Sequence, residues 1–298
     1  MIEKLAGEGS VTELCGLFKV MRSGYYAWKK RGMGKRQKEN ALLKEEIQRI
    51  YKESDGNYGS PRITPELKNK GYFCGHNRVA KLMKEMGLKG ALKSKFRPRT
   101  TDSRHALPVS RNLLQEIPKV TEQNQVWVAD ITYVKTEEGW LYLSAIMDLW
   151  SRKIVGWQAS ESLRSELVTD ALQKAITMRC PSKGLIHHSD RGVQYASQVC
   201  RNILKSTGIA SSMTEGGNCY DNAAMESFWS TLKTEMVYRK KFVSRKEARL
   251  ALFYYIEVFY NRKKRLHSRL GYRSPEEFEA RHKRISDFTI PQVSIISG

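Results

Sequence analysis

The sequence predicts an α/β fold: a mixed five-stranded sheet with flanking helices, preceded by a helical region and followed by a basic helical tail. Two observations predict it. β-branched and aromatic runs are concentrated between residues 121 and 235, whereas amphipathic helical patterns dominate before and after. The charge follows the same division, because residues 1–120 carry a net charge of +14, residues 121–235 one of −2 and residues 236–298 one of +9. A near-neutral core between two basic arms is typical of a catalytic or scaffold domain with nucleic-acid contacts on either side.

The overall composition narrows the class of protein. The 298 residues are 40% hydrophobic and 28% charged, and the net charge of +21 favours a polyanionic partner such as nucleic acid or an acidic membrane surface. No apolar run approaches the roughly 18 residues that span a bilayer, and no signal peptide is evident, so we expect a soluble protein that stays where it is made. Five scattered cysteines without a C-x-x-C pair argue against a disulfide framework and for a reducing compartment.

Five segments follow from these patterns. We expect a small helical DNA-binding unit over residues 1–36 and a helix-turn-helix-like domain over residues 37–92. A basic, irregular linker rich in proline, threonine and serine follows over residues 93–120. The catalytic core covers residues 121–240, and residues 241–298 form a basic helical arm.

The helix-turn-helix-like domain is predicted from three helices. The pattern indicates helices over residues 39–54 and 62–69, a break at Gly71, and a third helix capped by Asn77. The third helix directs basic side chains outward, and these would contact DNA if the helix lies in a major groove: Arg78, Lys81 and Lys84. A small three-helix bundle without a role in DNA binding would have the same pattern.

The core elements are predicted in chain order. Three β-rich runs at residues 126–134, 139–148 and 153–158 are joined by short turns and should form an antiparallel meander. A helix over 165–178, a strand over 184–188, a helix over 197–206, a strand over 209–213 and a helix from Asp221 onward follow. This order gives a mixed five-stranded sheet covered by helices.

Three carboxylates stand out in this core. Asp130 interrupts an apolar strand, where a carboxylate is unfavourable by several kcal/mol unless a metal ion or an arginine compensates. Asp190 follows a strand at an edge where ligands gather, and it meets Asp130 if the two strands are neighbours. On the last core helix, Glu226 and Lys233 share a face apart from the apolar stripe, because seven residues at 100° each bring them within about 20°.

Four motifs lie in and around these segments: Trp127-Val128-Ala129-Asp130-Ile131-Thr132-Tyr133, Asp148-Leu149-Trp150-Ser151-Arg152, His188-Ser189-Asp190-Arg191-Gly192-Val193-Gln194-Tyr195 and Asn218-Cys219-Tyr220-Asp221-Asn222-Ala223-Ala224-Met225-Glu226-Ser227-Phe228. They closely resemble the retroviral-integrase-like core of bacterial insertion-sequence transposases, specifically the second-frame protein of the IS-three family. The likeness covers nearly the whole chain. Arg191 and Val193 depart from the family pattern and leave their own roles open.

The resemblance implies a ribonuclease-H-like core that cuts and joins DNA strands. It places the family's metal-binding triad on Asp130, Asp190 and Glu226 and its basic residue on Lys233. The implied cofactor is Mg²⁺ or Mn²⁺, with two ions in each active site. The implied partners are the DNA of the element's terminal inverted repeats, target DNA, other copies of the chain in at least a dimer, and a first-frame protein, all in the bacterial cytoplasm at the nucleoid.

The carboxyl-terminal arm and the alternatives complete the prediction. A helix over residues 245–260 is followed by a basic run that would hold phosphates or simply face solvent: Arg262, Lys263, Lys264 and Arg265. Two other functions stay open, a structure-selective nuclease of the same fold and a catalytically inactive DNA-binding repressor. A zinc site at His187 and His188 is disfavoured, because adjacent strand residues point to opposite faces.

Overall fold

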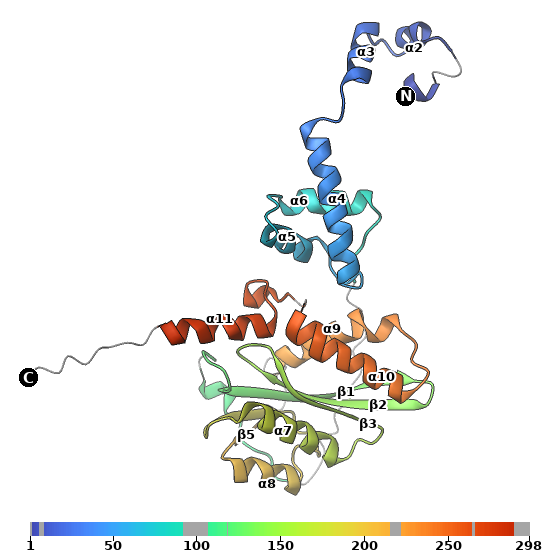
Figure 1. The fold of residues 1–298 in the computed structure, drawn as a ribbon. Helices are drawn as coiled ribbons and strands as arrows, with labels where there is room; N and C mark the ends of the chain where they lie inside the picture. Colours follow the sequence, from blue (N-terminus) through green and yellow to red (C-terminus); the bar gives the residue numbers. More distant parts are fainter. Residues whose placement is uncertain are drawn as a thin grey trace, which may run out of the picture. The chain divides into compact units, whose positions relative to one another are not determined.

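The computed structural model describes residues 2–5, 9–91, 107–117, 119–214, 222–263 and 266–288. The chain divides into two compact units, Met1–Gly90 and Ala91–Gly298 (Figure 1). Among the described residues, no helix combines the length and the apolar composition that crossing a bilayer requires.

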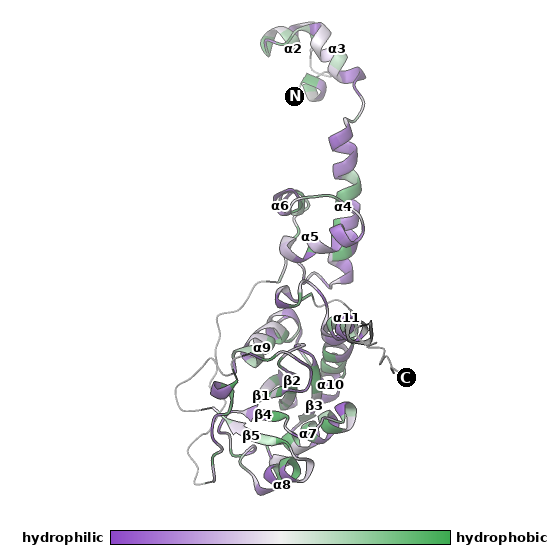
Figure 2. Cartoon of the chain, turned by 90° about the vertical axis from the view of Figure 1, so that its left-hand side faces the viewer, coloured by the Kyte–Doolittle hydropathy of each residue, from purple (hydrophilic) through white to green (hydrophobic). Residues whose placement is uncertain are grey.

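The first unit is entirely helical. Three short helices, α1 (Ile2–Leu5), α2 (Val11–Leu17) and α3 (Arg22–Lys30), share a small core in which Ile2, Cys15 and Tyr25 are buried. The longer α4 (Lys35–Glu53) contacts α5 (Ser60–Asn69) and α6 (His76–Glu85). Most apolar residues at helical spacing on these three helices are buried, although Leu42 of α4 is 57% exposed, and the rest of α4 is mostly hydrophilic (Figure 2). The predicted three-helix arrangement is confirmed.

The predicted cap of the third helix is wrong. The helix α6 begins at His76, and Gly75 occupies the N-cap position in an extended conformation without a side-chain hydrogen bond. Asn77 therefore lies inside the helix, because the helix begins two residues earlier than the position of a good capping side chain indicates. The break at Gly71 is confirmed, and its φ of +85° is a conformation that favours glycine.

The second unit is built on one five-stranded sheet. Its strands are β1 (Val126–Thr136), β2 (Gly139–Asp148), β3 (Ile154–Ser160), β4 (Ile186–Ser189) and β5 (Ala210–Met213), in the spatial order β3-β2-β1-β4-β5. β1, β2 and β3 pair antiparallel, whereas β4 pairs parallel with both β1 and β5. The mixed sheet with an antiparallel meander is the predicted topology.

Helices cover both faces of this sheet (Figures 1 and 2). On one face, α7 (Ser165–Arg179) and α8 (Gln198–Thr207) enclose a core that contains Trp127 and Ala129 of β1. On the other face lie α9 (Ala223–Glu235), followed by the 3-10 turn η2 (Val237–Arg239), and α10 (Arg245–Phe253), which continues as the π-helix η3 (Tyr254–Lys263). Because Trp127 and Ala129 point toward α7 and α8, strand alternation directs Asp130 toward α9.

Part of the predicted linker packs against the sheet. In residues 107–117, which include the 3-10 turn η1 (Leu114–Glu116), Ser110 donates a hydrogen bond to Ser211 (2.9 Å) and the Leu113 amide donates to Ser212 Oγ (2.9 Å). Both acceptors belong to β5. This stretch is therefore attached to an edge strand, whereas residues 92–106 lie outside the described part of the chain.

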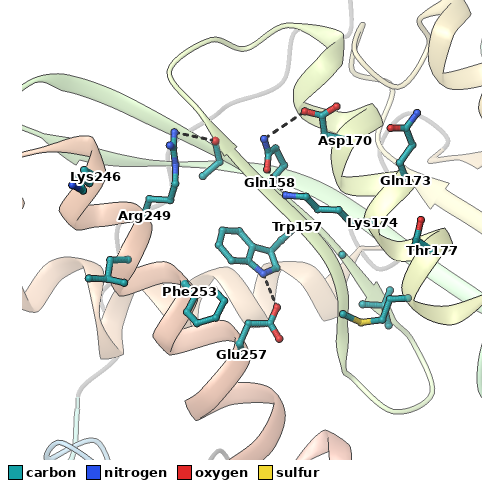
Figure 3. A pocket seen from close by; sticks show the side chains of 15 residues that line it. Trp157, Gln158, Asp170, Gln173, Lys174, Thr177, Lys246, Arg249, Phe253 and Glu257 are labelled. Carbon is teal, nitrogen blue, oxygen red and sulfur yellow. Dashed lines mark hydrogen bonds between the residues drawn. The ribbon is translucent and has the colours of Figure 1, made fainter.

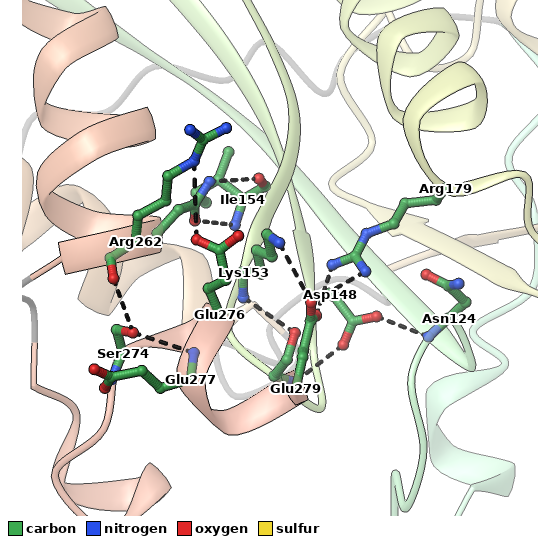
Figure 4. Close-up of polar contacts among 12 residues, drawn as sticks. Asn124, Asp148, Lys153, Ile154, Arg179, Arg262, Ser274, Glu276, Glu277 and Glu279 are labelled. Carbon is green, nitrogen blue, oxygen red and sulfur yellow. Dashed lines mark hydrogen bonds and ion pairs between the residues drawn. The ribbon is translucent and has the colours of Figure 1, made fainter. Parts of the chain in front are cut away.

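The carboxyl-terminal helix α11 (Pro275–Phe288) was not predicted, because few of its residues are apolar. Ion pairs attach it to the sheet domain (Figure 4), and Phe278 also packs against Trp150, with ring centres 4.9 Å apart. Glu279 pairs with Arg179 at 2.6 Å and with Lys153 at 3.4 Å, and the side chains of all three are mostly buried. The 3-10 turn η4 (Ser268–Leu270) connects η3 to α11.

Candidate active site

The strand register brings two of the predicted carboxylates to the same level of the sheet. Asp130 lies within β1 and Asp190 directly follows β4. These strands are parallel neighbours in which Val128 pairs with His188, so each aspartate lies two residues beyond the same pair. The convergence that the sequence made conditional on neighbouring strands is therefore present.

The third carboxylate comes from α9, which packs against β1. Glu226 lies in the first turn of this helix. The predicted capping residue Asp221 lies outside the described residues, and Asn222 is the observed N-cap. Three segments far apart in the sequence thus direct carboxylates toward one region.

The three carboxylates interact electrostatically. The pKa of Asp130 is raised from 3.8 to about 7, first by burial, then by the charge of Asp190, and to a smaller extent by that of Glu226. Burial and the two neighbouring charges all disfavour the ionised form of Asp130. A group of acids that repel one another, in a partly buried place, favours a bound cation.

Backbone and indole N–H groups fix both aspartates. The Ile131 amide donates to Asp130 Oδ1 at 2.7 Å, and the Trp229 indole donates to Asp130 Oδ2 at 2.9 Å. The Gly192 amide donates to Asp190 Oδ1 at 2.9 Å, and a Cβ at Gly192 would lie 3.0 Å from that oxygen. Glycine at this position therefore lets the loop approach the carboxylate closely.

Sequence reasoning missed Trp229 as a functional residue and assigned it only to the buried apolar stripe of its helix. The sequence feature that could have revealed it is its position three residues after Glu226, because side chains at this spacing are neighbours on the surface of a helix. A buried indole also needs an acceptor for its N–H group. The spacing alone does not say that this acceptor is Asp130.

The donor set suits a hard divalent cation. Carboxylate oxygens are the ligands that Mg²⁺ and Mn²⁺ prefer, and no soft sulfur ligand is among them. In the part of the chain that the structure describes, no group of three or more acidic, histidine or cysteine side chains is placed so that it could hold a metal ion. The residues fit the cation by their chemistry and by their mutual repulsion.

Lys233 lies beside the same group of acids. It lies on α9 two turns after Glu226, and the charge of Asp130 favours its protonated form, although burial lowers its pKa overall. Its ammonium group lies 4.9 Å from the centre of the Tyr133 ring, a cation–π contact. Glu226 and Lys233, which the sequence predicts to share one face of the helix, therefore both lie near Asp130.

The loop after β4 is tied to the end of β5. Arg191, one of the two departures from the family pattern, donates from Nε to the Thr214 carbonyl at 2.7 Å. The buried ring of His188 lies within hydrogen-bonding distance of Ser212 and Thr214, at 2.9 and 3.2 Å. Val193 is 41% exposed. These contacts give Arg191 and His188 a structural role in holding Asp190.

The residues that the sequence predicts to contact DNA have different surroundings from one another. Arg78 binds within its own unit, donating to Asn40 and pairing with Glu39. Lys81 and Lys84 are exposed on α6. Arg262 is exposed and lies 3.8 Å from Glu276 (Figure 4). The Lys263 side chain, Lys264 and Arg265 lie outside the described residues.

A cavity of about 1,000 Å³ lies elsewhere in the second unit, between β3, α7 and α10 (Figure 3). The Trp157 indole donates to Glu257 at 2.8 Å at one side of it, and Gln158 contacts Asp170 at 3.4 Å at the other. None of the three carboxylates lines it. This cavity is therefore separate from the candidate active site.

Comparison with known proteins agrees with this arrangement. Residues 120–219 and 207–275 each match a family model described as "Integrase core domain", and residues 37–96 match an "HTH-like domain". The chain is 45% identical over 273 residues to the insertion element IS600 uncharacterized 31 kDa protein of Shigella sonnei, covering 92% of this chain and 100% of that protein. It is 40% identical over 280 residues to transposase InsF for insertion sequence IS3A of Escherichia coli (strain K12), covering 93% and 96% of the two chains. The chain belongs to the IS3 family of insertion-sequence transposases.

Membership of this family agrees with the fold. The integrase core model spans the strands that carry Asp130 and Asp190, and the predicted ribonuclease-H-like sheet with flanking helices is confirmed. Among solved structures, the catalytic core domain of BIV integrase is 17% identical, with a TM-score of 0.42, and the match covers 55% of this chain and 99% of that one. The HTH-like match falls on α4, α5 and α6.

Proposed function

We propose that this transposase cleaves the DNA at the ends of its insertion sequence and joins the released ends to target DNA, with Asp130, Asp190 and Glu226 as the catalytic carboxylates. The observation that carries the proposal is the electrostatic coupling of these three groups at the end of the β1–β4 pair. The charged groups that raise the pKa of Asp130 are two further acids, Asp190 and Glu226, which is unusual for a carboxylate with a purely structural role.

The proposed chemistry is an in-line displacement at phosphorus. In cleavage, a water oxygen bonds to phosphorus and the bond to the 3′ oxygen breaks, which leaves a 3′-hydroxyl on the element. In joining, that hydroxyl bonds to a target phosphorus and displaces the target's own 3′ oxygen. When bound, Mg²⁺ or Mn²⁺ ions would neutralise the charge on the attacking and leaving oxygens. No covalent link to the protein forms, so Tyr133 and Ser189 are not nucleophiles.

The chain's own residues position this chemistry. Asp130, Asp190 and Glu226 would hold two metal ions. The Trp229 indole and the Gly192 amide keep the two aspartates in fixed orientations. Lys233 would hold a phosphate next to the reacting one, since it is a cation close to Asp130.

The remaining parts of the chain would bind DNA. We propose that Lys81 and Lys84 on α6, with Arg78, contact the terminal repeats, and that the basic run at residues 262–265 contacts phosphates. The reaction joins two ends, so at least two copies of the chain would act together, with or without a first-frame protein. Its DNA substrates place this activity in the cytoplasm at the nucleoid.

The test compares Asp130→Asn with Asp170→Asn, a control on α7 whose carboxylate accepts a hydrogen bond from Gln158 at 3.4 Å in the separate cavity. Each purified protein is given a labelled duplex of the element's end, a target duplex and Mg²⁺. Asp130→Asn should bind the duplex and produce neither a nick nor a joined product, while Asp170→Asn should produce both. Cutting without joining by the wild type would favour the nuclease, and binding without any cutting would favour the repressor.

A further inference from the structure

A second cavity, of about 460 Å³, opens beside the proposed active site. Its walls come from the end of β1, the start of β2 and the segment that follows α9. This volume lies within the roughly 300–1,000 Å³ that is usual for small-molecule sites. The cavity is therefore large enough for one nucleotide.

Exposed aromatic rings line this cavity. Trp140 is 46% exposed and Tyr238 is 48% exposed, although both are large and apolar. Tyr133 meets Trp140 edge to face, with ring centres 4.8 Å apart and planes at 81°. That contact fixes the orientation of Trp140 while nearly half of its surface stays open. Rings that are held in place and open to solvent are suited to stacking against a flat ligand.

Lysines surround the aromatic walls. Lys135, Lys233, Lys240 and Lys241 line the cavity, against a single carboxylate, Glu137. Within the described residues, none of these four lysines forms an ion pair. The cavity therefore combines flat apolar walls with an excess of positive charge.

The cavity is continuous with the proposed catalytic group through Lys233. This side chain lines the cavity, stacks on Tyr133, and is close enough to Asp130 to be stabilised by its charge. A ligand in the cavity would therefore lie next to the phosphodiester that reacts at the carboxylates.

We propose that this cavity binds one unstacked nucleotide adjacent to the scissile phosphodiester, with its base against Trp140 and Tyr238 and its phosphates near Lys240 and Lys241. The inference rests on the proposed function, because it takes DNA to be the substrate at the carboxylates. Single-stranded nucleic acid is bound in this way elsewhere, by aromatic platforms and a positive surface that follows the backbone. The nucleotide comes either from the element's end or from the target duplex.

The first test measures binding of the full chain in EDTA, so that no DNA is cut. The probes are a random-sequence duplex with one unpaired thymine and the same duplex fully paired. The wild type should prefer the unpaired base by about 5-fold or more, and Trp140→Ala should abolish that preference, since stacking on one aromatic side chain contributes about a 5- to 100-fold difference. Phe253→Ala, an aromatic residue of the same unit that is 51% exposed, should retain it.

A second pair of variants keeps the test valid if Trp140→Ala does not fold. Lys240→Ala with Lys241→Ala changes two exposed residues and should weaken binding of the unpaired duplex more than Lys246→Ala, a control on α10. The proposal is overturned if the wild type shows no preference for the unpaired base. It is also overturned if Phe253→Ala reduces the preference as much as Trp140→Ala does.

Photocrosslinking then distinguishes the two sources of the nucleotide. 5-Iodouracil is placed next to the cleavage site in the duplex of the element's end, or in the target duplex. A crosslink to Trp140 or Tyr238 in either arm supports the proposal and identifies the source, whereas crosslinks that map only to other residues in both arms contradict it. Wild-type protein that crosslinks there but never cuts would contradict the proposed function while the nucleotide site stands. Wild-type protein that cuts DNA but fails the binding test would contradict the nucleotide site while the proposed function stands.

Discussion

Two aspartates on the same sheet, Asp130, which we propose is catalytic, and Asp148, differ in what surrounds their buried carboxylates. Both have a raised pKa, and burial is the first cause in each case. Asp148 ends β2 and is fully buried, and it accepts N–H groups from Asn124 (2.7 Å), Trp150 and Ser151 (both 3.0 Å). The nearby charge of Arg179 favours its ionised form more than the charge of Glu279 opposes it (Figure 4).

Asp130 has the opposite electrostatic environment. Its acidic neighbours are Asp190, at the end of β4, and Glu226, on α9, and the cation beside it, Lys233, is itself partly buried. The protein therefore satisfies Asp148 internally and leaves Asp130 with excess negative charge around it. Burial alone therefore does not distinguish the proposed catalytic acid Asp130 from Asp148, whereas the dominant sign of the neighbouring charges does.

The largest expected effect is on catalysis. Asp130→Asn should lower the rate of end cleavage by about 1,000-fold or more, because it removes a charged metal ligand that would stabilise the transition state by several kcal/mol. Single-turnover cleavage of the labelled end duplex at saturating protein measures this. A residual rate within about 10-fold of the wild type would remove Asp130 from the proposed catalytic group.

The second prediction concerns folding. Asp148→Ala should lower the free energy of unfolding by about 3 kcal/mol or more, because it leaves three backbone N–H groups without their acceptor in a buried turn. Urea denaturation followed by circular dichroism measures it. Asp130→Asn should not be destabilised in the same experiment, and equal losses in both variants would contradict the distinction between the two aspartates.

The third prediction is a pH dependence of stability in metal-free protein. The pKa of Asp130 is about 7 in the folded chain, compared with 3.8 for an unperturbed aspartate, so folding favours its protonated form. The stability that this contributes is complete below about pH 4 and is lost as the pH rises through 7. Between pH 5 and pH 8 the wild type should lose about 2 kcal/mol that Asp130→Asn does not lose.

Thermal unfolding in EDTA at both pH values measures this difference. Added Mg²⁺ should restore stability to the wild type at pH 8, since a cation that binds only the folded state raises its stability. The same addition should have little effect on Asp130→Asn. A parallel pH response of the two proteins would show that Asp130 ionises freely in the folded state.

Much of this architecture could be predicted from the sequence, because it depends on local patterns. The strands around Asp130 and before Asp190 are marked by β-branched and aromatic runs, and each predicted core element is present with bounds shifted by a few residues. The carboxylates were found because Asp130 violates an apolar pattern and because the family motifs contain all three. The metal-binding role of the triad stays a prediction.

Contacts between distant segments could not be predicted. The apolar stripe of α9 places Trp229 in the interior but does not indicate that its N–H group is directed to Asp130. Nor does a periodicity show that Glu279 holds α11 through Arg179 and Lys153. The cavity at Trp140 was missed for the same reason, since its walls come from three segments.

The smallest expected effect tests how the indole of Trp229 supports Asp130. Its hydrogen bond favours the ionised carboxylate, so Trp229→Phe should raise the pKa of Asp130 further while keeping most of the packing. A hydrogen bond to a charged group contributes about 1.5–3 kcal/mol, which corresponds to a loss of about 10-fold or more in cleavage rate at neutral pH. Because a higher pKa is overcome by raising the pH, the rate should recover toward the wild-type value at pH 8.5.

A control, Trp157→Phe, removes an indole donor to Glu257 in the separate cavity and should leave the pH profile unchanged. If Trp229→Phe lowers the rate equally at every pH, its contribution is to packing of α9 and not to the ionisation of Asp130.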